Sequence, residues 1–359
     1  MNEQVPLHGG QLRAISERFN IPVAELIDFS ANINPEGSPA AVYSALRASL
    51  EDASVLTAYP NLEEMELKRS IAQYAGVRPQ NLAVANGFIP LLECALRALR
   101  IKRCVLPVPA FVEYRRSLAR TGMEIEPRIL RPGSNFRYDF DALLDGAHDA
   151  ILLANPQNPS GVVTSKELLL DFVSRCAERS MTVLLDEAFI DYTPSESLTA
   201  EVARCPNLVV FRSVTKFHGI PGLRVAYAGA AEPMVRMLDE NLPPWPITTL
   251  ASRGVAAALA DDAYAVHTRL ANQRRRDILQ AGLGTIGVHT YPSAANFLLL
   301  RLPSEIDVGR FWERMIVEHR MVLRDCSNYE GLAPGHLRVA VRVEAENERL
   351  VTAAASLLA

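Results

Sequence analysis

The segment TVLLDEAF, residues 182–189, is an apolar run that ends abruptly in two carboxylates. Short runs of the same kind recur through the middle of the chain: CVLPV (104–108), AILLANP (150–156), NLVVFRS (207–213) and RVAYAGA (224–230). Continuous apolar runs of strand length are typical of a mostly parallel sheet whose two faces are both covered by helices. The segment 166–180, KELLLDFVSRCAERS, has apolar residues at helical spacing and predicts one of these helices. We therefore expect an α/β fold with the sheet between helices.

A second domain is expected because 359 residues exceed what one hydrophobic core usually serves. The tract NLPPWPITT (241–249) holds three prolines, which break regular structure, and we place the start of the crossing there. Beyond it, NFLLLRL, MVLRDC and HLRVAVR predict the strands of a smaller α+β unit. The first 35 residues show no strand pattern and are expected to pack on that unit. The predicted domains are 36–245 for the large one, and 1–35 with 246–359 for the small one.

Charge and composition narrow the classes of partner. A net charge of −4 with scattered arginines offers no basic surface for nucleic acid. The apolar runs are shorter than the roughly 18–20 residues that span a bilayer, and MNEQVPLHGG lacks the features of a secretory signal, so we expect a cytoplasmic protein without a membrane role. An odd number of cysteines without C-x-x-C spacing predicts free thiols and no metal site. The cysteines are Cys94, Cys104, Cys176, Cys205 and Cys326.

Polar residues at the ends of the apolar runs mark the expected ligand crevice, because open α/β sheets bind ligands at the carboxyl ends of their strands. Asp186 ends one such run, and a buried carboxylate is costly unless a cation or hydrogen-bond donor meets it. A capping or ion-pair aspartate is the alternative interpretation.

A single lysine, Lys216, stands in FRSVTKFHGIPGLR (211–224). Burial and a neighbouring cation such as Arg224 lower the pKa of a lysine, as a nucleophilic amine requires. Ser213, Thr215 and Arg224 supply two hydroxyls and a guanidinium, which suit a phosphate. A reactive lysine, a phosphate site and a carboxylate together indicate pyridoxal 5′-phosphate, whose aldehyde reacts with lysine and whose ring nitrogen needs an acidic partner.

Three blocks carry a family resemblance: N-P-x-N-P-[ST]-G at 155–161, D-E-A-[YF] at 186–189, and S-x-[ST]-K at 213–216 with Arg224 eight residues after the lysine. In this order they resemble the fold-type-I aminotransferase superfamily of pyridoxal-phosphate enzymes, over nearly the whole chain. The resemblance implies a homodimer with shared active sites. It assigns Lys216 as the Schiff-base lysine, Asp186 as the partner of the pyridine nitrogen, Asn158 as the partner of the phenolic oxygen, Ser213, Thr215 and Arg224 as phosphate ligands, Phe111 as the stacking aromatic, and Tyr59 as a ligand of the phosphate in the neighbouring subunit.

Two positions depart from the pattern of the superfamily. Phe189 replaces a tyrosine that in many relatives also bonds the phenolic oxygen. After Gly87, small or acidic residues are usual, whereas this chain has Phe88, Ile89 and Pro90. The backbone N–H groups of Phe88 and Ile89 are expected to bind phosphate at a helix N-terminus. Pro90 has no N–H to donate but is tolerated in a first helical turn.

Within the superfamily, LHGG (7–10), DFSANINP (28–35), DEAFIDY (186–192) and LRDCSNYEGL (323–332) most resemble the threonine-phosphate decarboxylases of cobalamin biosynthesis. The resemblance implies decarboxylation of a phosphorylated amino acid, L-threonine O-3-phosphate, to (R)-1-aminopropan-2-yl phosphate. The alternative is an aminotransferase of the histidinol-phosphate type. A third, of another class, is a protein that keeps the fold and binds a ligand or partner without turnover.

Substrate anions are expected to bind Arg324 and Arg338, which match arginines of the phosphate-using relatives. The expected partners of these arginines are His8, Ser30 and Asn32, and Asn158 is expected to contact the substrate as well as the cofactor. The alternatives are a surface pair of arginines at strand ends and, for His8, a loop histidine bonded to backbone. Arg342 is interpreted as structural.

Overall fold

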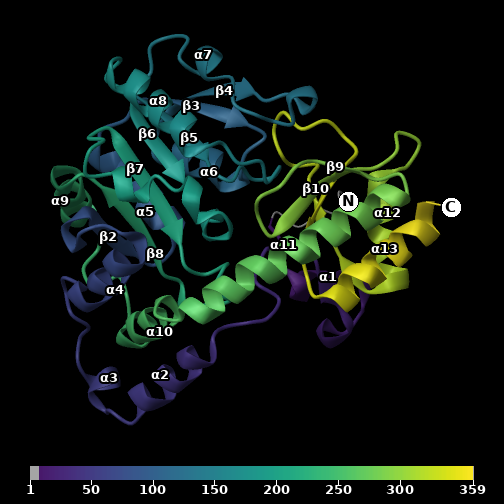
Figure 1. The fold of residues 1–359 in the computed structure, drawn as a ribbon, viewed down its shortest axis with the longest axis horizontal. Helices are drawn as coiled ribbons and strands as arrows, with labels where there is room; N and C mark the ends of the chain where they lie inside the picture. The colour runs from purple at the N-terminus through teal and green to yellow at the C-terminus, as the bar shows by residue number, and fades with distance from the viewer. Residues whose placement is uncertain (1–7, 359) are drawn as a thin grey trace.

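The structure is a computed structural model that describes residues 8–358. Its larger unit, on the left of Figure 1, is built around a seven-stranded sheet. Its strand order is β2-β8-β7-β6-β5-β3-β4. The pairs from β7 to β4 are parallel, and β8 runs antiparallel to both of its neighbours. This confirms the predicted α/β fold. The strands are β2 (Leu82–Ala85), β3 (Arg103–Val108), β4 (Glu124–Ile129), β5 (Ala150–Ala154), β6 (Thr182–Asp186), β7 (Leu208–Ser213) and β8 (Ala226–Ala230).

Helices cover both faces of this sheet because successive strand residues point to opposite faces. In β6, Leu184 packs with α5, α6 and α9, whereas Val183 and Leu185 pack with α8 on the other side. A third cluster joins α2, α4 and α10 to β2 and β8. The helices are α2 (Ala40–Leu50), α3 (Ser54–Thr57), α4 (Met65–Ala75), α5 (Phe88–Ala98), α6 (Val112–Arg120), α7 (Phe140–Leu143), α8 (Lys166–Ala177), α9 (Glu232–Asn241) and α10 (Thr249–Leu259).

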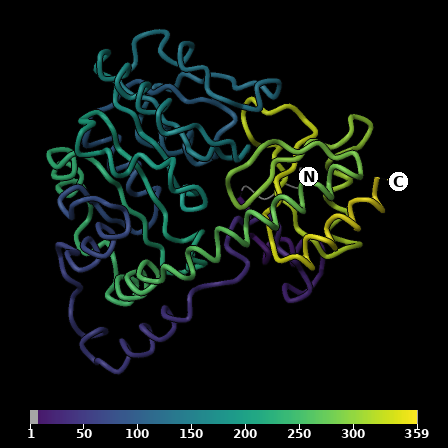
Figure 2. The backbone as a smooth tube through the Cα atoms, in the orientation of Figure 1, coloured from purple at the N-terminus to yellow at the C-terminus, as the bar shows by residue number. Residues whose placement is uncertain are grey.

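A smaller unit surrounds a four-stranded antiparallel sheet of order β12-β13-β10-β9 and the parallel pair β1-β11. The helices α1 and α13 pack into its core, so the two ends of the described chain lie in the same unit (Figure 2). Its strands are β1 (Ile27–Asp28), β9 (His289–Thr290), β10 (Phe297–Arg301), β11 (Met321–Val322), β12 (Arg324–Asp325) and β13 (His336–Ala340), and its helices are α1 (Leu12–Phe19), α11 (Asp262–Thr285), α12 (Val308–His319) and α13 (Glu344–Leu358).

Short 3-10 segments connect several of these elements. Within residues 8–358 they are Val23–Glu25, Pro79–Asn81, Pro132–Ser134, Ile190–Tyr192, Pro194–Glu196, Thr199–Glu201 and Pro221–Leu223.

The N-terminal region contains one strand that its sequence pattern does not indicate. Residues 27–28 form β1 and pair with β11, with Ile27 opposite Met321. A two-residue strand is too short to show alternation, and its pairing depends on the distant partner strand. Ile15, Leu26 and Phe29 pack in the core of the smaller unit.

The long helix α11 makes the passage between the two units (Figure 1). It follows α10, which packs on α2 and α4 although the predicted boundary assigns it to the small domain. The prolines of 241–249 do break the chain, between the end of α9 at Asn241 and the start of α10 at Thr249. The predicted domain boundaries themselves stay a prediction. Across residues 8–358, no helix combines the length and the apolar character that spanning a membrane requires.

Candidate functional site

One cavity of about 360 Å³ collects the predicted site residues at the carboxyl ends of the parallel strands. Asp186 ends β6, Ser213 ends β7, and Asn158 and Phe111 follow β5 and β3. The smaller unit closes the cavity from the other side with β12, β13 and the loop after β1. The predicted residues that line it are His8, Ser30, Asn32, Gly87, Phe88, Ile89, Phe111, Asn158, Asp186, Ser213, Thr215, Lys216, Arg224, Arg324 and Arg338.

Lys216 and Asp186 form the charged centre of the cavity. Burial lowers the pKa of the Lys216 amine, and the charges of Arg224 and Arg338 lower it further. The Asp186 carboxylate acts in the opposite direction and raises this pKa. Its Nζ donates to Ser213 Oγ at 3.3 Å and lies 5.6 Å from the centre of the Phe189 ring. The neutral amine is the form that attacks an aldehyde, and a lowered pKa makes this form more abundant.

Asp186 is held by two donors from the protein. Tyr114 donates its hydroxyl to Oδ2 at 2.5 Å, and the backbone N–H of Ala188 donates to Oδ1 at 2.8 Å. Burial raises the pKa of the Asp186 carboxyl, while Tyr114, Lys216 and Ala188 act in the opposite direction. Among residues 8–358, the carboxylate caps no helix and forms no ion pair within 4 Å, so the capping and ion-pair interpretation is wrong.

The turn that leads into α5 begins at Gly87, whose φ of +93° is strained for residues with a side chain. A Cβ at this position would lie 2.9 Å from Arg224 Nη2, so the absence of a side chain lets the guanidinium approach the turn. Ser213 Oγ and Thr215 Oγ1 lie 2.8 Å apart in the same cavity. These groups place two hydroxyls and a guanidinium near the start of α5.

The unusual residues after Gly87 fit this turn. Phe88 turns its ring into the core and meets Tyr114 and Phe211 edge-on, at 5.8 and 5.5 Å between ring centroids. Pro90 is the third residue of α5, where a missing N–H costs no hydrogen bond within the helix. The backbone N–H groups of Phe88 and Ile89 are therefore at the helix N-terminus, as expected.

Two arginines enter the cavity from neighbouring strands. The register of β12 and β13 places Arg324 directly opposite Arg338, and their side chains are 3% and 6% exposed. They are not a surface pair. Arg338 donates to Asn158 Oδ1 at 2.7 Å and to the carbonyl of Ser30 at 3.1 Å, and Arg324 donates to Asn328 Oδ1 at 2.8 Å. The two acceptors of Arg338 are neutral, and both arginines line the same cavity.

Three predicted residues from the first part of the described chain line the cavity: His8, Ser30 and Asn32. His8 Nε2 lies 3.1 Å from a Glu113 carboxylate oxygen, so the histidine ring does not simply bond to backbone. Burial lowers the pKa of His8, with Glu113 acting against it. Ser30 Oγ donates to Asp28 at 2.6 Å, and Asn32 is buried nearby.

Tyr59 is the predicted site residue that does not line the cavity. Its side chain is 80% exposed and stacks on Trp245, with 4.6 Å between ring centroids. Its predicted role concerns a neighbouring subunit and stays a prediction.

Sequence reasoning did not single out Tyr114 or Tyr329. Tyr329 lies beside the anion-facing groups, because its hydroxyl is 3.3 Å from Arg338 Nη1 and 3.4 Å from Asn158 Oδ1. Tyr114 follows Phe111 by three residues, a spacing that places both side chains on one face of a helix. This spacing could have indicated that Tyr114 lies near the site.

The fold and the cavity define an enzyme of the pyridoxal-phosphate-dependent aminotransferase class. The chain belongs to the aminotransferase class I and II family, whose family model matches residues 24–353. This confirms the predicted superfamily, and with it the cofactor class.

Individual relatives include two kinds of enzyme. The chain is 33% identical to the threonine-phosphate decarboxylase of Salmonella typhimurium, over 98% of this chain and 96% of that protein. It is 27% identical to the histidinol-phosphate aminotransferase of Methylobacillus flagellatus, over 96% and 92%. Among solved structures, the histidinol-phosphate aminotransferase of Clostridium acetobutylicum superposes with a TM-score of 0.87, at 25% identity and over 93% and 99% of the two chains.

The residues of the cavity fit pyridoxal phosphate. Gly87 leaves room beside Arg224, Lys216 has a lowered pKa, and Asp186 faces it across the cavity. Within the described part of the chain, the buried atoms Asn32 Oδ1 and Arg338 Nε lack hydrogen-bond partners. Both residues line the cavity.

Proposed function

We propose that the protein decarboxylates a phosphorylated amino acid, with L-threonine O-3-phosphate as substrate and (R)-1-aminopropan-2-yl phosphate as product. The observation that carries the proposal is the cross-strand pair Arg324 and Arg338. Like charges directly opposite on neighbouring strands repel each other, and both arginines line the cavity, where an anion can bind between them. An amino-acid phosphate brings a carboxylate and a phosphate, which match two guanidinium groups.

The cofactor, when bound, accepts the electrons released from the bond that breaks at the substrate Cα. Lys216 would hold the cofactor and then give way to the substrate amine. Asp186 would keep the ring nitrogen protonated, since a carboxylate beside that nitrogen stabilises its positive charge. Asn158 would donate through its amide Nδ2, because its Oδ1 already accepts from Arg338.

The phosphate of the cofactor would bind at Ser213, Thr215, Arg224 and the start of α5, beside Gly87. Phe111, the residue before α6, would stack on the ring. The substrate would bind to His8, Ser30, Asn32, Arg324 and Arg338.

The bond that breaks is the one held perpendicular to the ring plane. Anchoring a substrate at two anionic groups fixes that angle, and a decarboxylase must hold the Cα–carboxylate bond there.

The second candidate is an aminotransferase of the histidinol-phosphate type. The identity of 27% to a protein of that name supports it. Such an enzyme would align the Cα–H bond and use the released Lys216 as the general base. Such an enzyme would also need an oxo acid as a second substrate.

We also propose a homodimer in which Tyr59 reaches the cofactor phosphate of the partner subunit. Exposed apolar side chains support this, because they gather on α2, α3 and the segment after them, which project from the body of the molecule in Figure 1. These side chains are Tyr43, Leu50, Leu56, Tyr59 and Leu62, with Trp245 stacked on Tyr59.

The cofactor assignment is tested by borohydride reduction of the cofactor-loaded protein followed by peptide mass analysis. We expect the mass of the reduced cofactor on Lys216, and none in a Lys216→Ala variant. Lys166, which is paired with Glu201 away from the cavity, is the control lysine and should stay unmodified. An unmodified Lys216 in the presence of excess cofactor would contradict the proposal.

The reaction is tested by single-turnover spectra and a carbon dioxide assay with threonine phosphate, serine phosphate and histidinol phosphate. We expect carbon dioxide from threonine phosphate, with the cofactor recovered as the aldehyde. Conversion of the cofactor to pyridoxamine phosphate without carbon dioxide would favour the aminotransferase. No spectral change with any of the three would favour binding without turnover or a different substrate class.

A further inference from the structure

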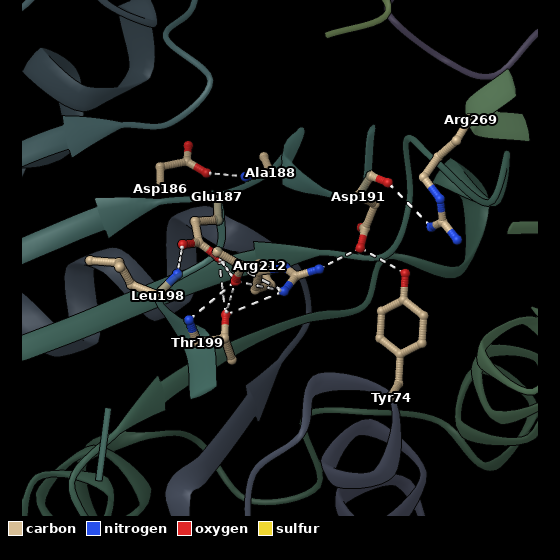
Figure 3. A network of polar contacts seen from close by, with 10 residues as sticks. Tyr74, Asp186, Glu187, Ala188, Asp191, Leu198, Thr199, Arg212 and Arg269 are labelled. Carbon is tan, nitrogen blue, oxygen red and sulfur yellow. Dashed lines mark hydrogen bonds and ion pairs between the residues drawn. The ribbon is translucent and has the colours of Figure 1, made fainter. Parts of the chain in front are cut away.

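A network of buried charges lies beneath the strands that carry the cavity residues (Figure 3). Glu187, Asp191 and Arg212 are 0%, 3% and 5% exposed. Arg212 Nη1 lies 3.8 Å from Glu187 Oε2, and Arg212 Nη2 donates to Asp191 Oδ1. The Glu187 carboxylate accepts three more hydrogen bonds, from Ser197 Oγ at 2.5 Å, Leu198 N at 2.6 Å and Thr199 Oγ1 at 3.0 Å.

Strand alternation places this network directly behind the cofactor residues. Glu187 follows Asp186 in the chain, and Arg212 precedes Ser213. Leu185 and Val210 pack on the α8 side of the sheet, so Glu187 and Arg212, two residues further along each strand, continue that side. Asp186 and Ser213 continue the opposite side, where the cavity lies.

The network also joins the ends of β6 and β7 to each other. The backbone N–H of Glu187 donates to Phe211 O at 2.8 Å, which extends the strand pairing beyond Asp186. Arg212 Nη1 donates to Thr199 Oγ1 at 3.2 Å, and the same hydroxyl donates to Glu187. Thr199 therefore bridges the charged side chains of the two strands.

Two further elements are bonded to Asp191. Tyr74 of α4 donates its hydroxyl to Asp191 Oδ1 at 2.7 Å. Arg269 of α11 donates to the backbone carbonyl of Asp191 at 3.5 Å. The helix that passes between the two units is thus in contact with the network.

Stabilisation of the fold does not by itself account for three buried charges. Removing charges from water costs several kcal/mol each, and well-packed apolar replacements are often as stable or more so. Directional hydrogen bonds differ from apolar packing in that they fix the relative positions of the groups that make them. The groups fixed here are the ends of the two strands that deliver Asp186 and the Ser213–Lys216 turn.

We propose that Arg212 is a positioning residue for the cofactor site. Its guanidinium donates to Asp191 and Thr199 and forms an ion pair with Glu187 at 3.8 Å, and these contacts hold Asp186 and Lys216 at the separation that the cofactor ring requires. The inference rests on the proposed function, since it assumes that Asp186 and Lys216 bind the two ends of one ring.

The test replaces Arg212 by lysine, which keeps the charge but loses the fork that reaches two carboxylates. The matched control is Asn207→Ala. Asn207 Nδ2 donates to Val173 O at 3.0 Å and Met181 O at 3.1 Å, so it ties the amino ends of β6 and β7, away from the cavity. Both variants lose polar ties on the same two strands, and both are expected to melt at a lower temperature.

Three quantities are measured on the full-length protein. They are the melting temperature, the dissociation constant of pyridoxal phosphate, and the midpoint pH of the visible absorbance of the bound cofactor. We expect R212K to raise the dissociation constant about tenfold or more, which corresponds to about 1.4 kcal/mol, and to move the midpoint pH. In N207A the dissociation constant should stay within about twofold of that of the unmodified protein, and the midpoint pH within about 0.2. Substitutions at distant sites usually have effects this small on each other.

The inference would be overturned if, in both variants, cofactor binding weakens in proportion to the fall in melting temperature. Arg212 would then have only a structural role. An unchanged midpoint pH in R212K would also overturn it. Should R212K fail to fold, Thr199→Val removes the bridging hydroxyl and is judged by the same criteria. Absence of cofactor absorbance in the unmodified protein would overturn the proposed function instead, before any variant is compared.

Discussion

Replacing Tyr114 by phenylalanine isolates the hydrogen bond that holds Asp186. The substitution removes the hydroxyl that donates to Asp186 Oδ2 at 2.5 Å and keeps the ring, which meets Phe88 and Phe111 edge-on. A hydrogen bond to a charged group contributes about 1.5–3 kcal/mol. Asp186 would keep the Ala188 N–H as its donor.

The effect on stability depends on pH in a direction set by the pKa of Asp186. Burial raises that pKa in the folded protein above its value in the unfolded chain, so ionisation of Asp186 opposes folding. The protein therefore becomes less stable as the pH rises from the pKa of Asp186 in the unfolded chain to its pKa in the folded protein. Loss of the Tyr114 bond raises the folded pKa further, because the bond favours the ionised form. The cofactor-free Y114F protein should therefore lose about 1.5–3 kcal/mol at high pH and less at low pH.

Urea unfolding of the cofactor-free protein at pH 5 and pH 8 measures this difference, and titration with pyridoxal phosphate measures its consequence. A protonated Asp186 cannot serve as the anion beside the ring nitrogen, so Y114F should bind the cofactor about 10- to 150-fold more weakly, the factor that corresponds to the lost bond. Tyr138→Phe, which removes a buried hydroxyl bonded to the Ala154 backbone, is the control. A loss of stability in Y114F that is equal at both pH values, or larger at pH 5, would refute the reasoning.

Three other substitutions test separate parts of the site. Gly87→Ala should fold but bind pyridoxal phosphate more weakly, because its Cβ displaces the Arg224 guanidinium and its φ is strained; unchanged affinity would contradict the role of the turn. Tyr59→Phe should weaken cofactor binding by about 1.5–3 kcal/mol if its partner is a phosphate, measured by the same titration; unchanged binding would contradict the shared site. Arg338→Lys should raise KM for threonine phosphate at least about tenfold, whereas Arg342→Lys, bonded to Glu346, should not; equal effects would contradict the anchor assignment.

Much of the site was predictable because its residues stand at the ends of recognisable strands. Apolar runs fix where β5, β6 and β7 end, and parallel strands bring Asn158, Asp186 and Ser213 to one edge of the sheet. The hydrogen bond from Tyr114 to Asp186 was not predictable in this way. It depends on how α6 is rotated over the sheet, and helical periodicity shows which face is apolar without showing which residue that face meets.

The packing of α10 and the pairing of β1 were unpredictable for related reasons. The face of α10 that carries Val255 and Ala258 is apolar, and it suits a core of either unit. β1 contains two residues and is defined only by its partner, β11. In the turn after Gly87, the backbone conformation directs the ring of Phe88 into the core. The sequence shows only that a bulky residue stands at an expected phosphate site, and it does not show where the ring points.

The contact between Arg338 and Asn158 links the expected substrate site to the expected cofactor site. Arg338 Nη1 donates to Asn158 Oδ1 at 2.7 Å, and Tyr329 contacts both residues. A substrate carboxylate or phosphate at Arg338 would compete with the amide oxygen for the guanidinium, because ionised acceptors form the stronger hydrogen bonds. Asn158 would then be less constrained just as the substrate amine reaches Lys216. Phe189 has no hydroxyl that could share this task, so the orientation of Asn158 would carry more weight in this chain, and Arg338 would govern both the substrate anion and that orientation.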